Sequence, residues 1–288
     1  MDTIIGIGLD ALAYGMLLFI ISIGLSVMMG LMRVINLAHG AFAMVGGYIA
    51  SYAIRQLGLP YVVAVPTAVA ATVVVALPLE FLLFRRIYGG AEPLKQVLMT
   101  IGIAFAVIGI VNAVFGPTIK PIPLPGPLHG IVDIASHTMA VHRLVLIVAG
   151  LVIAAGLWLA VEKSNFGVRL RAAVDNPDMA AALGIRTDRL YLVTFGIAVA
   201  LAAFGGIAGA ELMPIEPTYA LRYMVTFLVV VSVGGAGSTT GALVASLIIG
   251  LVDTAGRYLF PSYGMFFTYA AVILIVELAP NGLARRSA

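Results

Sequence analysis

Long apolar runs separated by short polar stretches make up most of this chain. Residues 4–30 form the first run, which carries one acidic side chain near its outer end. At about 1.5 Å per residue, a helix of that length crosses a hydrocarbon core of roughly 30 Å. The same pattern predicts further membrane segments over residues 41–57, 60–84, 96–116, 139–161, 191–213 and 264–279.

One late apolar run is broken by small and polar residues. Residues 224–233 are too few to span a membrane, and apolar residues resume only over 242–259. We therefore expect a discontinuous or re-entrant segment, which brings the total to about eight membrane segments. The break contains Gly234, Gly235, Gly237, Ser238 and Thr239.

The predicted fold class is an all-α polytopic membrane protein, with residues 1–288 forming a single transmembrane domain. Between two of the predicted spans, residues 117–137 contain five prolines, a composition typical of an extended, irregular surface loop.

The longest polar interruption is the loop over residues 162–190, which holds nine charged side chains. Within it, Asn176 is a suitable helix cap, Pro177 suits the first helical position, and Asp178 suits the positive end of the helix dipole. Gly184 can adopt the left-handed conformation that ends a helix. We predict a helix of about two turns, too short to be stable without packing. Its residues would be Asn176, Pro177, Asp178, Met179, Ala180, Ala181, Ala182, Leu183 and Gly184.

A second interruption follows the first span. Arg33, Asn36 and His39 recur every three residues and would lie along one stripe of a helix, and Gly40 would permit a break. Asn36, His39 and Gly40 can line a pathway or gate, or the two side chains can hydrogen-bond neighbouring helices. We favour hydrogen bonding. For residues 234–241, a pathway element facing a cavity and a tight buried turn both remain open.

Composition excludes a soluble protein of ordinary kind. Of 288 residues, 62% are hydrophobic and 10% are charged, whereas soluble domains are nearer 45–50% apolar. The basic residues are distributed between apolar spans and form no basic face, so nucleic acid is not an expected partner. The expected partner surface is the lipid bilayer.

Basic residues also predict orientation, because they accumulate in cytoplasmic loops. Eleven lie in residues 31–39, 85–95, 162–190 and the C-terminal tail, against five on the opposite side. We therefore expect the N-terminus outside and the C-terminus in the cytoplasm.

The sequence offers no residues for catalysis. It has no Cys, its four His form no metal-ligand pattern, and none of its lysines lies in a phosphate-binding GxxxxGK[ST] loop. We expect no metal, no cofactor and no enzymatic activity. An ion-coupled transporter or channel is the alternative, but its candidate carboxylates, except Asp253, lie near predicted span ends.

Three motifs carry a family resemblance. GLMRVINLAHGAFAMVGGYIA at 30–50, ALGIRTDR at 182–189 and VGGAGSTTGALV at 233–244 resemble, in this order, the permeases of branched-chain amino-acid ABC importers. In the family's coupling loop a Glu-Ala-Ala motif precedes a Gly. This chain has Asp178, Met179, Ala180 and Gly184 at that spacing, so the first two positions differ.

The resemblance implies an ABC importer permease fold in the bacterial inner membrane. It implies the first of two related permease subunits, forming half of a translocation pathway for branched-chain or related amino acids. The implied partners are a second permease subunit, two ATPase subunits that hydrolyse the ATP, and a periplasmic solute-binding protein. Residues 176–184 would be the element that couples to an ATPase.

Overall fold

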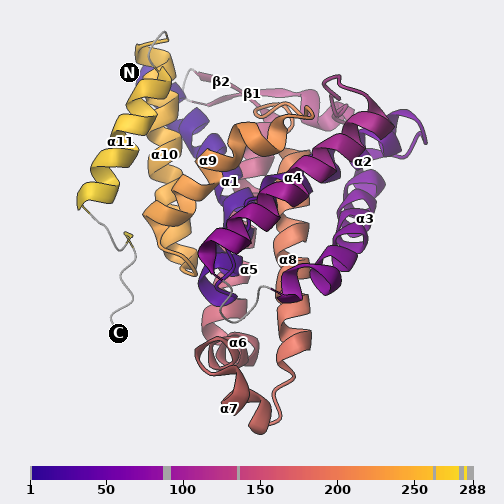
Figure 1. Cartoon of the computed structure of the whole chain (residues 1–288). Helices are drawn as coiled ribbons and strands as arrows, with labels where there is room; N and C mark the ends of the chain where they lie inside the picture. Colours follow the sequence, from indigo (N-terminus) through magenta and orange to yellow (C-terminus); the bar gives the residue numbers. More distant parts are fainter. Residues whose placement is uncertain (1, 87–91, 135–136, 262–263, 279–281, 284–288) are drawn as a thin grey trace.

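The computed structural model describes residues 2–86, 92–134, 137–261, 264–278 and 282–283, and these are almost entirely helical (Figure 1). The major elements are α1 (Asp2–Leu31), α2 (His39–Arg55), α3 (Tyr61–Leu82), α4 (Pro93–Phe115), α5 (Val141–Trp158), α6 (Asn165–Asp175), α7 (Pro177–Ala182), α8 (Thr187–Ala208), α9 (Tyr219–Gly234), α10 (Thr239–Leu259) and α11 (Gly264–Leu278). Short helical turns occupy η1 (Phe84–Arg86), η2 (Gly126–His129) and the π-helical turn η3 (Leu159–Lys163), and two strands are β1 (Ile131–Ile134) and β2 (His137–Ala140).

The helix lengths confirm the predicted fold class. Within the described residues, six helical segments are long and apolar enough to cross a membrane, beginning at residues 4, 61, 93, 141, 187 and 239. Shorter apolar helices lie at Tyr219–Gly234 and Phe266–Leu278. Counted separately they number eight, in approximate agreement with the predicted total, but the set differs. Helix α2, predicted as a span over residues 41–57, is not among them, and α10, the second half of the expected broken segment, is long enough to span by itself.

Helix α1 lies at the centre of the molecule. It packs against α5, α8, α9 and α10, and its side chains from Leu17 to Ile21 are fully buried. Neighbouring helices approach it closely where small residues meet. For example, a Cβ on Gly24 would lie 2.7 Å from the Ala198 carbonyl oxygen of α8. Within a membrane the hydrophobic effect does not drive helices together, so close van der Waals packing of this kind stabilises their association instead.

A small β-hairpin corrects one prediction. The irregular loop expected over residues 117–137 contains η2 and β1, and β2 continues from His137. The strands are antiparallel, with Val132 opposite Met139. Two β-branched residues, Ile131 and Val132, favour an extended backbone, and Thr138 donates a 2.8 Å hydrogen bond to Asp133 across the pair.

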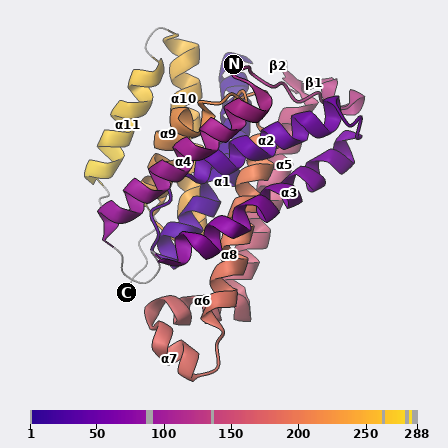
Figure 2. The ribbon, with the colours of Figure 1, turned by 45° about the vertical axis from the view of Figure 1, so that its right-hand side comes forward.

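The molecule has two distinct ends. Helices α6 and α7 project beyond the rest of the fold, whereas β1, β2 and the start of α1 lie at the opposite end (Figures 1 and 2). We call these the α6–α7 end and the hairpin end. The loops joining α2 to α3 and α8 to α9 also lie toward the hairpin end, as expected if successive helices cross a membrane.

Two glycines of α8 provide a matched test of helix packing. A Cβ on Gly206 would overlap the Ala43 carbonyl of α2, whereas a Cβ on Gly196 would have only Val73, at 3.8 Å, near it. We expect Gly206→Ala to destabilise the fold by about 1–3 kcal/mol through overpacking. Gly196→Ala should be neutral or slightly stabilising because Ala favours helix. Thermal unfolding of both variants in detergent would measure this, and equal midpoints would contradict the packing described.

Candidate functional site

Helices α6 and α7 form a short helical hairpin that is tied to η3 and α8 by two side-chain hydrogen bonds. Ser164 caps α6 by accepting a 3.1 Å bond from the Phe166 amide. Arg171 donates to the Val161 carbonyl of η3 at 2.7 Å. The hydroxyl of Tyr191, on α8, donates to the Ala173 carbonyl at 2.9 Å. The hairpin is therefore braced against both of the long helices that enter and leave it.

Helix α7 begins and ends as the sequence predicted. The Asn176 side chain accepts a 3.0 Å bond from the Met179 amide, and Pro177 occupies the first turn. Gly184 has φ +80°, the left-handed conformation, and the Ile185 amide then donates to the Ala180 carbonyl at 3.0 Å. This arrangement satisfies carbonyls that would otherwise lack partners at the helix end. The six-residue helix is slightly shorter than expected.

The tip of this hairpin exposes apolar side chains among charged ones. Ala180 is buried against the hairpin, but Met179 is 58% exposed and Leu183 is 75% exposed. Ala181 and Ala182 are exposed as well. The exposed charged residues nearby in sequence are Asp175, Asp178, Arg186, Asp188 and Arg189. Apolar side chains concentrated on a projecting polar segment are typical of a protein–protein contact.

Residues 32–38 leave the helix and run as a largely buried, non-helical stretch in which Arg33 is exposed. Gln96 accepts a 2.8 Å bond from the Ile35 amide, and Thr100 accepts a 3.2 Å bond from the Leu37 amide. Both side chains come from α4. The three-residue stripe predicted for Arg33, Asn36 and His39 is wrong, because these residues do not share one helix.

Asn36 and His39 are both buried and bonded within the protein. The Asn36 side-chain oxygen accepts from the Ala38 amide at 3.0 Å, and its amide group contacts the Met28 sulfur at 3.5 Å. His39 Nε2 lies 2.9 Å from the Ile21 carbonyl of α1. Gly40 lets α2 approach α9, since a Cβ there would lie 3.1 Å from the Ala220 carbonyl. This geometry agrees with the hydrogen-bonding interpretation.

The break between α9 and α10 is a tight turn packed on α1. Gly235 and Gly237 have φ values of +88° and +82°. The Gly237 amide donates to both the carbonyl and the hydroxyl of Ser26, at 2.9 and 3.1 Å. Ser238 then caps α10 by accepting a 3.0 Å bond from the Gly241 amide, and Thr239 is its first helical residue. Gly234, which ends α9, contacts the start of α10 closely. Of the two interpretations, this geometry resembles the buried turn.

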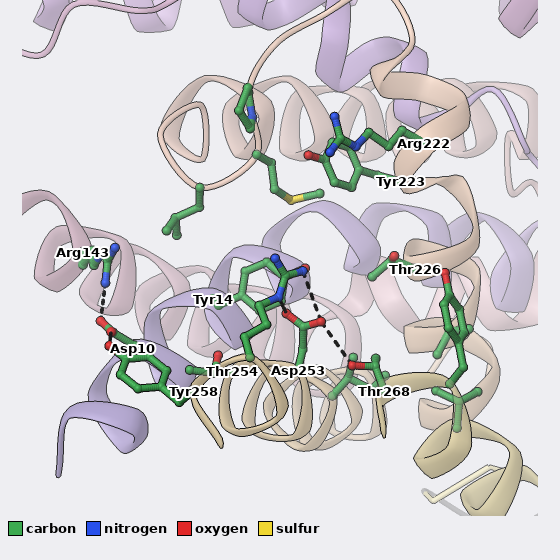
Figure 3. A pocket seen from close by; sticks show the side chains of 18 residues that line it. Asp10, Tyr14, Arg143, Arg222, Tyr223, Thr226, Asp253, Thr254, Tyr258 and Thr268 are labelled. Carbon is green, nitrogen blue, oxygen red and sulfur yellow. Dashed lines mark hydrogen bonds and ion pairs between the residues drawn. The ribbon is translucent and has the colours of Figure 1, made fainter. Parts of the chain in front are cut away.

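A cavity of about 410 Å³ lies between α1, α5, α9, α10, α11 and the loop before α9 (Figure 3). It is located in the half of the molecule toward the hairpin end, because it is lined near the start of α1 and the end of α10. Two aspartates anchor its polar lining. Asp10 is paired with Arg143 and accepts a 2.7 Å bond from the Tyr258 hydroxyl. Asp253 is paired with Arg257.

The Asp253 carboxylate accepts three hydrogen bonds. Two come from Arg257, at 2.7 and 3.2 Å, and one comes from Thr268 of α11 at 3.1 Å. A third arginine, Arg222, is paired at 2.7 Å with Glu216, which lies just outside the cavity lining. Apolar side chains, including Val229, Ile249 and Val272, complete the wall. The cavity thus combines balanced charges with an apolar surface.

Only part of this cavity could be predicted from the sequence. Asp253 stood out as an acidic residue inside a predicted span, and Arg257 lies one helical turn further on. No pattern connected these two with Asp10, Arg143 or Arg222, because the five residues come from four different helices. None of the predicted pathway residues lines the cavity.

The apolar helices, the break at residues 234–241 and the projecting hairpin define a multi-pass membrane permease. The family model described as "Branched-chain amino acid transport system / permease component" matches residues 7–276. The chain belongs to this family of ABC transporter permeases.

Several curated relatives resemble the chain along nearly its whole length. BraD of Pseudomonas aeruginosa, a high-affinity branched-chain amino acid transport system permease protein, is 27% identical, covering 96% of this chain and 94% of BraD. LivH of Escherichia coli K12, which has the same description, is 26% identical over 93% and 91%. The probable branched-chain amino acid transport permease LivH of Methanocaldococcus jannaschii is 25% identical over 95% and 90%. No solved structure matches the chain significantly.

The contact between residues 32–38 and α4 can be tested with isosteric variants. Thr100→Val would leave the buried Leu37 amide without its partner, which should cost about 1–3 kcal/mol of folding free energy. Thr67→Val is the control, since that hydroxyl bonds only to carbonyls of its own helix, α3. Chemical denaturation in detergent micelles should show the first variant clearly less stable than the second. Identical unfolding curves would show that the hydrogen bond from Leu37 contributes nothing.

Proposed function

We propose that this chain is the transmembrane permease subunit of an ATP-driven ABC importer for branched-chain or related amino acids. The observation that carries the coupling part of the proposal is the projecting tip of α7. Its apolar side chains, Met179, Ala181 and Leu183 among them, are exposed between charged residues. Family membership and the printed names of the relatives support the solute class.

The proposed assembly contains four kinds of polypeptide. This permease pairs with a second homologous permease subunit, and each of the two contributes half of the translocation pathway. Two ABC ATPase subunits bind the α6–α7 end. A periplasmic solute-binding protein delivers the amino acid to the hairpin end and provides most of the selectivity.

In the proposed mechanism, the α6–α7 hairpin transmits the movement of the ATPase subunits to the membrane helices. When the ATPase subunits close on ATP, they displace α7, whose apolar tip is seated in a groove of the ATPase. The bonds from Arg171 to Val161 and from Tyr191 to Ala173 hold the hairpin to η3 and α8. A displacement of α7 is therefore passed to the long helices α5 and α8 rather than absorbed by a flexible loop.

We further propose that residues 1–288 act as a single transmembrane domain in the bacterial inner membrane. The coupling loop over residues 162–190 would face the cytoplasm, with the N-terminus outside and the C-terminus inside. The excess of basic residues toward the α6–α7 end supports this orientation.

Coupling can be tested by placing a charge on the tip of α7. Ala181→Arg should reduce ATP-driven uptake at least tenfold, because a buried unpaired charge at a protein interface is strongly unfavourable. Asn165→Arg adds the same charge to an exposed position at the start of α6 and should leave uptake near normal. Uptake by proteoliposomes containing the assembled importer would be measured, with membrane insertion checked by protein yield. Full uptake by Ala181→Arg would refute docking through α7.

Orientation can be tested by thiol labelling, since the native chain has no cysteine. Leu183→Cys is exposed at the α6–α7 end, and Ile131→Cys is exposed on β1 at the hairpin end. In intact spheroplasts that produce the permease without the ATPase subunits, a membrane-impermeant maleimide should label Ile131→Cys and should label Leu183→Cys only after lysis. The reverse pattern would show that the proposed orientation is inverted.

A further inference from the structure

We propose that the cavity at the hairpin end is a binding site for a small zwitterionic solute, an amino acid with an apolar side chain. This inference deepens the proposed function by assigning a solute site within the permease itself. The inference rests on the proposed function for one point, that the protein transports a solute. The chemistry of the ligand is inferred from the residues that line the cavity.

The first feature is the balance of charge. The three arginines of the lining, Arg143, Arg222 and Arg257, each face a carboxylate, from Asp10, Glu216 and Asp253 respectively. Glu216 lies just outside the lining, but its ion pair neutralises Arg222, so the formal charges of the three pairs cancel and favour neither a net anion nor a net cation. A solute with one carboxylate and one ammonium group finds an opposite charge for each.

The second feature is unused hydrogen-bonding capacity. A guanidinium has five N–H donors, and Arg222 uses one of them on Glu216. Tyr14, Tyr223 and Thr226 line the same cavity, and their hydroxyl groups bond to no other side chain or backbone group in the described part of the chain. Figure 3 shows Arg222 and Tyr223 along one side of the cavity and Tyr14 and Asp253 along the other. Polar groups can therefore reach a solute from both sides.

The third feature is the position of the charges within a membrane protein. Ionisable residues inside membrane segments are costly and usually mark a solute or ion pathway. Asp253 lies well inside α10 and is only 7% exposed, yet it adjoins a cavity rather than lipid. A role in helix packing alone would not require the open volume between Asp253 and Arg222.

The fourth feature is size and apolar surface. The volume of about 410 Å³ falls near the lower end of the roughly 300–1,000 Å³ that small-molecule sites occupy. Leu212, Val229 and Ile249 supply apolar wall beside the charged groups. This combination suits one amino acid with an aliphatic side chain better than a peptide or a sugar.

The test measures solute binding to the assembled importer in lipid nanodiscs without the binding protein. Saturation-transfer NMR detects weak binding, with L-leucine as the probe. We expect transfer to L-leucine, and about tenfold weaker binding of N-acetyl-L-leucine and of L-leucinamide, which each lack one charge. Equal binding of all three compounds, or none of L-leucine, would overturn the proposal.

Two variants link that signal to the cavity. Thr226→Trp fills the space and should abolish the leucine signal, while Tyr223→Phe removes one free hydroxyl and should weaken binding several-fold. Tyr52→Phe is the matched control, because Tyr52 is an exposed α2 residue outside the cavity lining. If Thr226→Trp fails to assemble, the comparison of the two Tyr→Phe variants decides the matter. Unchanged binding in Tyr223→Phe and in Thr226→Trp would place the site elsewhere.

Failure of this inference is distinguishable from failure of the proposed function. Wild-type importer that shows ATP-driven uptake, together with leucine binding that the cavity variants do not alter, would refute only the cavity site. Wild-type protein that binds leucine in a cavity-dependent manner without ATP-driven uptake would support the site and refute the importer assignment.

Discussion

The structure depends on one constraint: backbone polar groups at membrane depth must find partners inside the protein. The chain breaks its helices twice in largely buried positions, at residues 32–38 and 234–241. In the first break, Gln96 and Thr100 accept hydrogen bonds from backbone amides. In the second, Ser26 accepts a hydrogen bond from the Gly237 amide. Each bond replaces one that water would otherwise make, and without it the buried amide would be strongly unfavourable.

Both breaks lie against the last turns of α1. Gly30 of α1 contacts Gly237 directly, backbone to backbone, which is feasible only because neither residue has a side chain. His39, at the start of α2, bonds to the Ile21 carbonyl one helix away. Helix α1 therefore serves as the scaffold on which two irregular segments, far apart in the sequence, are fixed.

The two ends of the molecule differ in chemistry. At the α6–α7 end, a short capped helix presents apolar side chains, and hydrogen bonds brace it against α8 and η3. At the hairpin end, ion pairs such as Asp253–Arg257 surround a cavity. A passive passage needs only the second feature. In the proposed function, the braced apolar tip is the surface through which the permease receives energy from another protein.

Features of the fold that depend on neighbouring residues were predictable from the sequence. Features that form only when distant segments pack together were not. The start of α7 at Asn176 and Pro177 and its end at Gly184 follow from capping chemistry, which acts within a few residues. The break near Gly237 follows from glycine content. The β-hairpin was missed because the prolines before it indicated a loop. The cavity was missed because its charged residues meet only through tertiary packing, which no spacing along the chain encodes.

The most direct test of the central claim asks where the energy for transport comes from. The complete importer, with its binding protein, would be reconstituted into proteoliposomes, and accumulation of labelled leucine against its gradient would be followed. The account predicts accumulation that requires ATP and a catalytically intact ATPase, and that persists when ionophores collapse every ion gradient. Accumulation driven by a proton or sodium gradient with the ATPase inactive would contradict it.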